Sequence, residues 1–254
     1  MEKIKTVEYK IAWTNNLDDI FHKDFIFVEN QVFDANMSED VFKKKYIDNI
    51  YGPSLLVLAY IQGQPVGSDA LWRNDIDGKL AYQSVDTCVL PLARGKGVFT
   101  GMVRKKLASV EKEAIIYGFP NVNSTHGFLK TGWHLIDECY TTILISSKSL
   151  TEENKIKIDR NYAKWWYAGV DDLFSLNKRG RWWLVAKRKY ILYSVLGELE
   201  EDAASLFPTL KGAKIFLYKS HCKTFYNKNR VPMRIITSPT TIVDTIPSWK
   251  LDSI

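Results

Sequence analysis

The sequence predicts an α+β protein, with a mixed, mostly antiparallel sheet flanked by helices and a smaller second α/β part of similar order. Residues 54–90 form three β-prone runs separated by two short turns, which is the pattern of an antiparallel meander. Helical and strand patterns alternate only around residues 91–133, so the sheet is not a doubly wound parallel one. A similar order of elements returns after a polar stretch at residues 146–160, and this predicts the second part.

The elements expected before that polar stretch follow the order βααβββαβαβ. Alternating polarity predicts the first strand, and periodic apolar residues predict two helices after it. We expect the first helix to begin after an N-cap at Asn15 or Asn16, and the second after Ser38. The expected strands are residues 7–13, 54–61, 66–73, 81–90, 114–119 and 133–145, and the expected helices lie within 17–33, 38–50, 98–114 and 120–131.

The second part repeats this order in a shortened form, ββαβαβ. Its expected strands are residues 174–185, 189–196, 213–218 and 233–237, and its expected helices are 200–210 and 221–228. Residues 215–236 echo residues 115–136 in their apolar and aromatic positions, which indicates a degenerate internal repeat. Gly197 stands alone before the second part's helix, so no Gly-rich turn accompanies the echo. We therefore expect two domains, 1–148 and 149–254.

Charge is distributed unevenly along the chain, which has a net charge of +6. Residues 1–150 hold 17 Lys and Arg against 18 Asp and Glu, whereas residues 151–254 hold 18 against 11. The basic second part suits an anionic substrate, a membrane surface or nucleic acid, or it is a solvated face. No recognised nucleic-acid motif is present, so we do not expect nucleic acid as a partner.

Cysteine usage and hydropathy indicate the compartment. Cys88, Cys139 and Cys222 are widely spaced and form no C-x-x-C pair, which suits a reducing compartment and predicts no metal site. The first residues lack the apolar core of a signal peptide, and no apolar run approaches ~18 residues. We expect a cytoplasmic protein without a membrane span.

The clearest functional signal is the stretch from residue 87 to residue 100. A β-prone run ends at Pro91, the sequence Arg94-Gly95-Lys96-Gly97 forms a turn, and a helical pattern begins at Val98. Two glycines at a helix start let backbone N–H groups converge on an anion, and the helix dipole favours negative charge there. The segment is neither a Walker A loop nor a dinucleotide fingerprint. It is either a pyrophosphate site or an ordinary turn with solvated basic side chains.

Over residues 5–145 this pattern resembles the GCN5-related N-acetyltransferase (GNAT) superfamily, in a two-part bacterial type with a degenerate second domain. The element order matches, and residues 89–99 look like the family's acyl-CoA loop, Q/R-x-x-G-x-G/A, with Arg94 and Gly97 in place. Phe99 stands where Gly or Ala is usual. A later segment resembles the motif N-x₆-Y-x-K-x-G-F, with Phe128 in the place of its Tyr and the following residues in register: Asn121, Lys130, Gly132 and Trp133.

The resemblance implies a cofactor, acetyl-CoA or another short acyl-CoA. Its pyrophosphate would lie on the amides of residues 94–100, and its pantetheine arm along residues 87–89, where strands 82–90 and 114–119 splay apart. The cofactor-binding residues expected on this basis are Thr87, Cys88, Val89, Arg94, Gly95, Lys96, Gly97, Val98, Phe99, Thr100, Asn121, Asn123 and Ser124.

The implied chemistry is direct attack of a neutral amine on the thioester, which requires a base. Asp86 is the expected catalytic base because it is a carboxylate within an otherwise uncharged strand; otherwise it caps a turn or bonds a neighbouring hydroxyl. Phe128 has no proton to give to the leaving thiolate, so the acid is Tyr117, His126 or water. Cys88 is expected to be a small core residue and not a nucleophile.

These observations predict an acyl-CoA-dependent N-acyltransferase acting on a small primary amine, such as an amino sugar or sugar nucleotide of cell-surface polysaccharide synthesis. The alternative is a non-catalytic CoA-binding or protein-interaction module with the same fold. The second part also places tryptophans beside a basic run at residues 178–189, which either stack on sugars or bases or form sheet core: Trp165, Trp166, Trp182 and Trp183.

Overall fold

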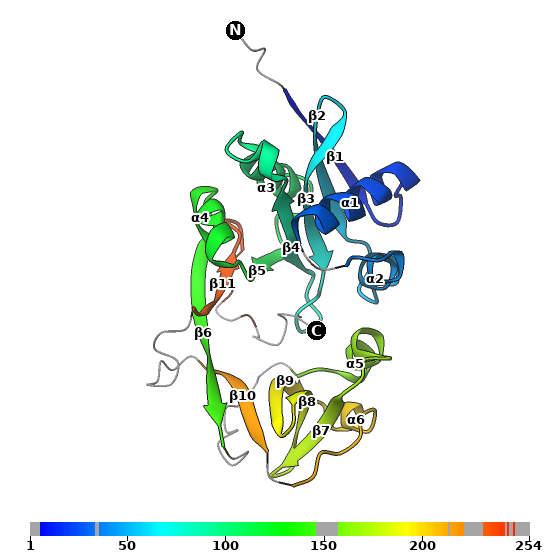
Figure 1. The fold of residues 1–254 in the computed structure, drawn as a ribbon, viewed down its shortest axis with the longest axis vertical. Helices are drawn as coiled ribbons and strands as arrows, with labels where there is room; N and C mark the ends of the chain where they lie inside the picture. Colours follow the sequence, from blue (N-terminus) through cyan, green and yellow to red (C-terminus); the bar gives the residue numbers. More distant parts are fainter. Residues whose placement is uncertain are drawn as a thin grey trace. The chain divides into compact units, whose positions relative to one another are not determined.

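The chain divides into two compact units (Figure 1). A computed structural model describes residues 6–33, 36–145, 157–212, 214–220, 231–241, 243 and 246. The first unit comprises Met1–Ile136 with Ile235–Asp244, and the second comprises Asp137–Arg234 with Thr245–Ile254. Within the described residues, no helix is both long and apolar enough to cross a membrane.

The first unit is built on a mixed sheet whose strands are, in spatial order, β1 (Val7–Trp13), β2 (Leu55–Ile61), β3 (Gln64–Arg73), β4 (Ala81–Val89), β5 (Ile115–Gly118) and β11 (Met233–Thr237). Strands β1 to β4 pair antiparallel, β4 and β5 pair parallel, and β5 pairs antiparallel with β11. The predicted mixed, mostly antiparallel sheet is therefore confirmed.

Helices and strands of the first part follow the expected order. The helical segments are α1 (Asp19–Val32), α2 (Glu39–Phe42), the π-helical turn η1 (Lys43–Ile47), the short 3-10 turn η2 (Pro91–Ala93), α3 (Val98–Leu107) and α4 (Val122–Lys130), and the part ends in β6 (His134–Leu144). The order βααβββαβαβ is thus confirmed.

Two details of these helices differ from expectation. The N-cap of α1 is Asp18, whose carboxylate accepts from the amide of Phe21 at 2.7 Å, and not Asn15 or Asn16. Helix α3 ends at Leu107, earlier than the predicted residue 114. Residues 111–113 are charged and do not continue the apolar stripe, and the Ile115 amide bonds the carbonyl of Leu80 at 3.0 Å.

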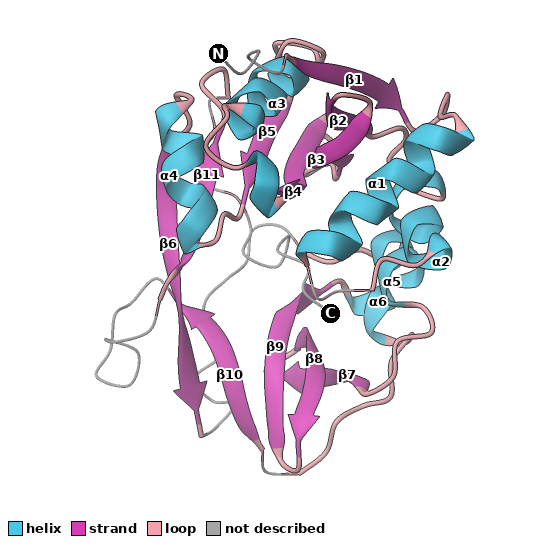
Figure 2. Cartoon of the chain, turned by 45° about the horizontal axis from the view of Figure 1, so that its top comes forward, coloured by secondary structure: helices cyan, strands magenta, loops and turns pink. Residues whose placement is uncertain are grey.

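The core of the first unit lies on both faces of its central strands. All seven residues of β2 are buried, which explains its continuous apolar sequence. Helix α1 crosses one side of the sheet (Figure 2). An apolar cluster joins α3 and α4 to the sheet, and its buried members are Leu55, Leu71, Tyr82, Val103, Ala114, Ile116, Phe128, Trp133 and Ile236.

The second unit has its own sheet, in the order β6, β10 (Ile215–Ser220), β9 (Leu192–Leu199), β8 (Arg181–Lys189) and β7 (Leu173–Lys178). Strand β10 pairs antiparallel with β6 and parallel with β9, and the remaining pairs are antiparallel. Its apolar core includes Leu176, Trp183, Val185, Tyr193, Val195 and Phe216. Trp183 is therefore core, whereas Trp182 is half-buried.

Several expectations for the second part are corrected. The single predicted strand 174–185 is wrong, because Arg179 and Gly180 have positive φ angles of 56° and 81° and turn the chain between β7 and β8. Helix α5 (Arg160–Tyr167) was not expected, although Asp159 caps it. The predicted helix 200–210 reduces to α6 (Glu201–Ala204). The predicted helix 221–228 and residues 146–156 of the predicted connector lie outside the described residues.

The two units share a strand–helix–strand arrangement, which supports the internal repeat indicated by the likeness of residues 215–236 to residues 115–136. In both, a helix connects two strands that pair parallel: β4 and β5 in the first, β9 and β10 in the second. The two parts of the sequence also exchange strands. Strand β11, from the end of the sequence, pairs with β5 of the first unit, and β6, which ends the first part, pairs with β10 of the second unit. The division into domains 1–148 and 149–254 stays a prediction.

Candidate functional site

Strands β4 and β5 separate after a short pairing. Their parallel register runs from Ala81 opposite Ile115 to Ser84 opposite Gly118, where β5 ends. Strand β4 continues to Val89, so no strand of the described residues pairs with residues 85–89 on that side. On its other edge β4 carries a bulge, because Asp86 and Thr87 together oppose a single residue of β3. The pairing therefore leaves a gap in the sheet beside the bulge.

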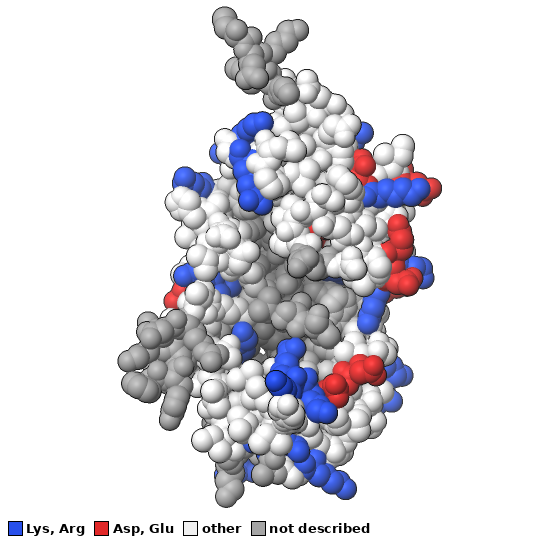
Figure 3. All heavy atoms as spheres, viewed as in Figure 1, with Lys and Arg blue, Asp and Glu red and all other residues white. Residues whose placement is uncertain are grey.

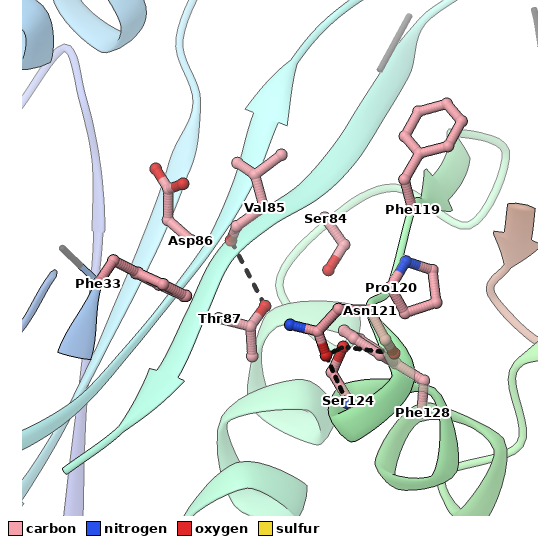
Figure 4. Close-up of a pocket in the computed structure, with 10 residues that line it drawn as sticks. All are labelled: Phe33, Ser84, Val85, Asp86, Thr87, Phe119, Pro120, Asn121, Ser124 and Phe128. Carbon is pink, nitrogen blue, oxygen red and sulfur yellow. Dashed lines mark hydrogen bonds between the residues drawn. The ribbon is translucent and has the colours of Figure 1, made fainter. Parts of the chain in front are cut away.

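A cavity of about 150 Å³ opens at this gap (Figure 4). It brings together four of the predicted site residues: Asp86, Thr87, Asn121 and Ser124. Asn123 is exposed and does not line the cavity, and Cys88 is buried away from it. The lining residues are Phe33, Ser84, Val85, Asp86, Thr87, Phe119, Pro120, Asn121, Ser124 and Phe128.

The turn before α3 has the geometry of an anion cradle. Gly95 and Gly97 have positive φ angles of 75° and 78°, a conformation that glycine adopts without strain. A Cβ atom added to either would meet nothing within 4 Å, so the space beside the turn is open. Helix α3 begins after Gly97 without a side-chain cap, which leaves its first N–H groups for a ligand. Lys96 is exposed here, and Arg94 is exposed with its Nε donating to the Val89 carbonyl at 3.1 Å.

Asp86 is held by two residues of the π-helical turn η1. The Lys45 Nζ donates to its two carboxylate oxygens at 2.9 Å and 2.8 Å, and the Tyr46 hydroxyl donates to it as well. Asp86 itself has a positive φ of 49°, which the bulge in β4 imposes. Sequence reasoning missed both partners, because they lie about forty residues away and share no motif with Asp86.

A buried acid lies near this ion pair. Glu29 of α1 is 2% exposed, and its carboxylate accepts hydrogen bonds from Ser68 and from the Cys88 thiol. Burial, and then the charge of Asp86, raise the pKa of Glu29 well above its usual value. Burial and the same glutamate also raise the pKa of the Cys88 thiol. Cys88 is therefore a buried thiol without nucleophilic character.

A second buried pair lies on the opposite face of β3, because successive side chains of a strand alternate. Asp69 follows Ser68 and accepts from Lys106 Nζ of α3 at 2.5 Å, and both side chains are fully buried. Lys106 also donates to Ser84 Oγ at 2.7 Å, and Thr87 donates to Asp69 at 2.7 Å. Burial raises the pKa of Asp69 and lowers that of Lys106.

These buried groups carried a signal that the sequence reasoning did not use. Glu29 lies four residues after Phe25, and Lys106 four residues after Met102, so each stands on the apolar stripe of its helix. Asp69 lies within the apolar run of β3. A charged residue on a buried face needs a partner, which is the pattern that could have identified them.

The two positions that depart from the resemblance meet in space. The rings of Phe99 and Phe128 lie 5.1 Å apart in an edge-to-face arrangement, and Phe128 is 4% exposed. Neither proposed substitute for the missing acid lines the cavity. The Tyr117 hydroxyl is buried and donates to the Asn74 carbonyl at 3.2 Å, and His126 is exposed on α4.

The distribution of basic side chains and of metal-ligating side chains also bears on the site. On the face shown in Figure 3, the Lys and Arg side chains of the described residues are scattered and form no continuous stripe. Where the chain is described, no group of three or more His, Cys, Asp or Glu side chains could hold a metal ion. The anion cradle and the cavity are two features that could hold a cofactor.

A parallel strand pair that separates beside a glycine-rich helix start defines the class: the chain has the GNAT fold. Two solved structures match 91% of it at a TM-score of 0.57 and 10% identity. One is a GCN5-related N-acetyltransferase from Kribbella flavida, of which 71% is covered, and the other a probable N-acyltransferase from Enterococcus faecalis, of which 72% is covered.

A third similar structure is Eis1 from Mycobacterium abscessus, with a TM-score of 0.54 and 10% identity over 83% of this chain and 65% of that protein. No protein-family model matches the sequence, and no curated protein matches it. These structures confirm the predicted fold class, and two of them match both parts of the chain.

Proposed function

We propose that this protein is an acyl-CoA-dependent N-acyltransferase that transfers an acetyl or another short acyl group to a primary amine. The observation that carries the proposal is the gap between β4 and β5, which opens a cavity containing Asp86 beside an uncapped helix start. The cradle supplies backbone donors for a diphosphate, and the gap supplies a strand edge for an extended arm.

The cofactor would be held mostly by main-chain groups. The amides of residues 94–100 would receive its pyrophosphate, with Arg94 and Lys96 adding charge and Val98, Phe99 and Thr100 beginning the helix. The backbone of residues 87–89 would pair with the arm, while Asn121, Asn123 and Ser124 would lie beside it. The bound acyl-CoA supplies an activated acyl group whose thiolate leaves readily.

Asp86 would take the proton from the attacking amine. Its Oδ2 accepts from both Lys45 and Tyr46, whereas its Oδ1 accepts from Lys45 and has a second lone pair, so an incoming amine can bond Oδ1 beside Lys45. The side chains of Lys45 and Asp86 are 15% and 16% exposed, and the pair is therefore accessible to a substrate. Lys45 thus marks the place where the acceptor nitrogen would lie.

The acceptor class that we put forward is an amino sugar or a sugar nucleotide, used in the cytoplasm for cell-surface polysaccharide synthesis. The basic balance of residues 151–254 supports it, because a nucleotide diphosphate is anionic.

One observation favours a second candidate, a non-catalytic module that binds CoA. The carboxylate proposed as base is engaged by Lys45 and Tyr46, and Phe128 offers no proton. A protein that binds the cofactor without turning it over would show the same features.

Two measurements separate these candidates. Calorimetry with acetyl-CoA tests the cofactor site, and absence of both heat and a thermal shift would refute it. Thiol release over a panel of amines and amino sugars then tests transfer, and tight binding with a silent panel supports the module. In an active protein, Asp86→Asn should lower turnover at unchanged CoA affinity. Asp75→Asn is the matched control, because Asp75 forms an ion pair with Arg73 outside the cavity.

A further inference from the structure

Ser84 links the cavity to a buried cation. Its side chain is 8% exposed and lines the cavity, and its Oγ accepts from Lys106 Nζ at 2.7 Å. Among the described residues, no group accepts the proton of the Ser84 hydroxyl. Because Lys106 occupies a lone pair of Oγ, that proton is left to donate to a ligand in the cavity.

The other hydroxyls that line the cavity are already engaged. Thr87 Oγ1 donates to Asp69 at 2.7 Å, and Ser124 Oγ lies 3.1 Å from the side-chain oxygen of Asn121, whose carboxamide is its acceptor. Neither contacts an ammonium. Ser84 is therefore the cavity hydroxyl best placed to give a proton and to recover one.

The surroundings of Lys106 favour loss of a proton from its ammonium group. Asp69 from β3 is the charged group that faces it, and the rings of Phe128 and Trp133 lie 5.4 Å and 5.7 Å from its Nζ. The second carboxylate oxygen of Asp69 is buried and has no hydrogen-bond partner in the part of the chain that the structure describes. Burial lowers the pKa of Lys106 and raises that of Asp69, so the ammonium gives up a proton more readily than a solvated lysine does.

We propose that Ser84 forms the subsite for the sulfur of acyl-CoA and supplies the proton to the departing thiolate. Lys106, which donates hydrogen bonds to Ser84 and Asp69, would replace the proton that Ser84 gives up. This inference rests on the proposed function and deepens it. The geometry assigns the two proton transfers to opposite faces of the sheet: Asp86 lies on the α1 face with Glu29 and Lys45, whereas Ser84 lies on the α3 face with Lys106.

The step balances in atoms and electrons. The C–S bond breaks as the C–N bond forms, and the sulfur keeps the electron pair. The sulfur takes the hydroxyl proton of Ser84, and Ser84 takes a proton from the Lys106 ammonium. After the thiol leaves, Ser84 takes a proton from solvent in the cavity and passes its own proton back to the buried Lys106, and Asp86 returns to solvent the proton that it took from the amine.

Calorimetry tests the subsite without any acceptor, by comparing CoA with dethio-CoA, which carries hydrogen in place of the thiol. Wild-type protein should bind CoA about threefold to tenfold more tightly, as one hydrogen bond allows. This preference should grow as pH rises from about 7 to about 9, because a larger fraction of the thiol is then ionised and a thiolate accepts a stronger hydrogen bond from the Ser84 hydroxyl. In Ser84→Ala it should fall to about one.

Ser54→Ala is the matched control, because Ser54 is a fully buried serine of the same unit whose Oγ accepts from the Arg73 amide outside the cavity. It should keep the wild-type preference. An equal preference in Ser84→Ala and wild type would overturn the subsite while leaving the CoA site intact. Failure of wild type to bind either compound would overturn both this inference and the proposed function.

A second variant addresses Lys106. Lys106→Met alone leaves Asp69 buried and uncompensated, so we pair it with Asp69→Leu, which removes both charges together. The double variant should bind dethio-CoA as wild type does and lose the rise in CoA preference with pH. In an active protein, kcat should fall as pH rises through the pKa of Lys106. In Ser84→Ala, kcat should show no such decrease with pH. A rise in CoA preference that survives in the double variant would contradict the role of Lys106.

Discussion

The Phe99 ring of α3 occupies the space that a side chain at Gly127 of α4 would need. A Cβ atom added to Gly127 would lie 2.7 Å from Phe99 Cε1, closer than van der Waals contact permits. Phe99 stands where a small residue is usual in the resemblance, and Gly127 lies beside Phe128, the second departure. The large and the small residue therefore compensate each other between helices α3 and α4.

Gly127→Ala should destabilise the protein by up to about 2 kcal/mol, the overpacking cost of about 1–3 kcal/mol less the gain in helix propensity of about 1 kcal/mol. Urea unfolding measures this change. Combining it with Phe99→Leu should recover most of the loss, since the smaller side chain makes room for the methyl group. Additive losses in the double variant would show that the two residues are not coupled.

Gly97→Ala should weaken CoA binding and also lower the free energy of unfolding by about 1–2 kcal/mol, the cost of a left-handed alanine. Gly78→Ala provides the control, because Gly78 has a similar φ of 70°, also meets nothing within 4 Å and lies in the turn before β4. Both variants should unfold at similar urea concentrations. Equal CoA affinities measured by calorimetry would argue against the cradle.

Glu29→Gln should stabilise the protein increasingly as pH rises above 4.5, the ordinary pKa of the carboxyl. Burial raises the pKa of Glu29 in the folded state, so the folded state binds more protons than the unfolded state above pH 4.5, and stability falls with rising pH. A tenfold difference in proton affinity between the two states corresponds to about 1.4 kcal/mol. Urea unfolding of both proteins at pH 5 and pH 8 measures the effect, and a difference that does not change with pH would contradict it.

Glu198→Gln should show the opposite dependence. Glu198 of β9 is 1% exposed, and although burial raises its pKa, hydrogen bonds from Arg181 and Lys157 lower it overall. The stability from this carboxylate is therefore present above pH 4.5 and lost as pH falls through the lowered pKa. The substitution should destabilise by about 1 kcal/mol at pH 7, since both cations are partly exposed, and by less at pH 3. Thermal unfolding at pH 3 and pH 7 measures the loss of stability. An equal loss at the two pH values would exclude the ion pairs as its cause.

Local sequence patterns were sufficient to predict most elements of the first part. Strand alternation and turn residues determine the meander, and Gly95 and Gly97 could be identified as turn glycines because their backbone conformation disfavours other residues. The same reasoning placed Asp86 and Asn121 near one another through a family resemblance, and the structure brings both to one cavity.

The partners of these residues could not be predicted in the same way. The contact between Lys45 and Asp86 depends on how a π-helical turn lies against β4, and the contact between Lys106 and Asp69 depends on how α3 lies on β3. Such pairs join distant segments and follow from tertiary packing. The pairing of β11 with β5 likewise joins segments far apart in the chain.

The exchange of strands has a consequence for synthesis on the ribosome. Ile236 belongs to the apolar cluster of the first unit, the Ser238 amide donates to the Ile116 carbonyl at 2.9 Å, and the Ile116 amide donates to Thr241 at 2.8 Å. The nascent first unit therefore keeps an open edge at β5 until residue 241 has left the exit tunnel. Strand β11 follows every described strand of the second unit in the chain, so the first unit completes its sheet only after those strands have been synthesised, and a chain released early at residue 148 would expose the β5 edge to chaperones.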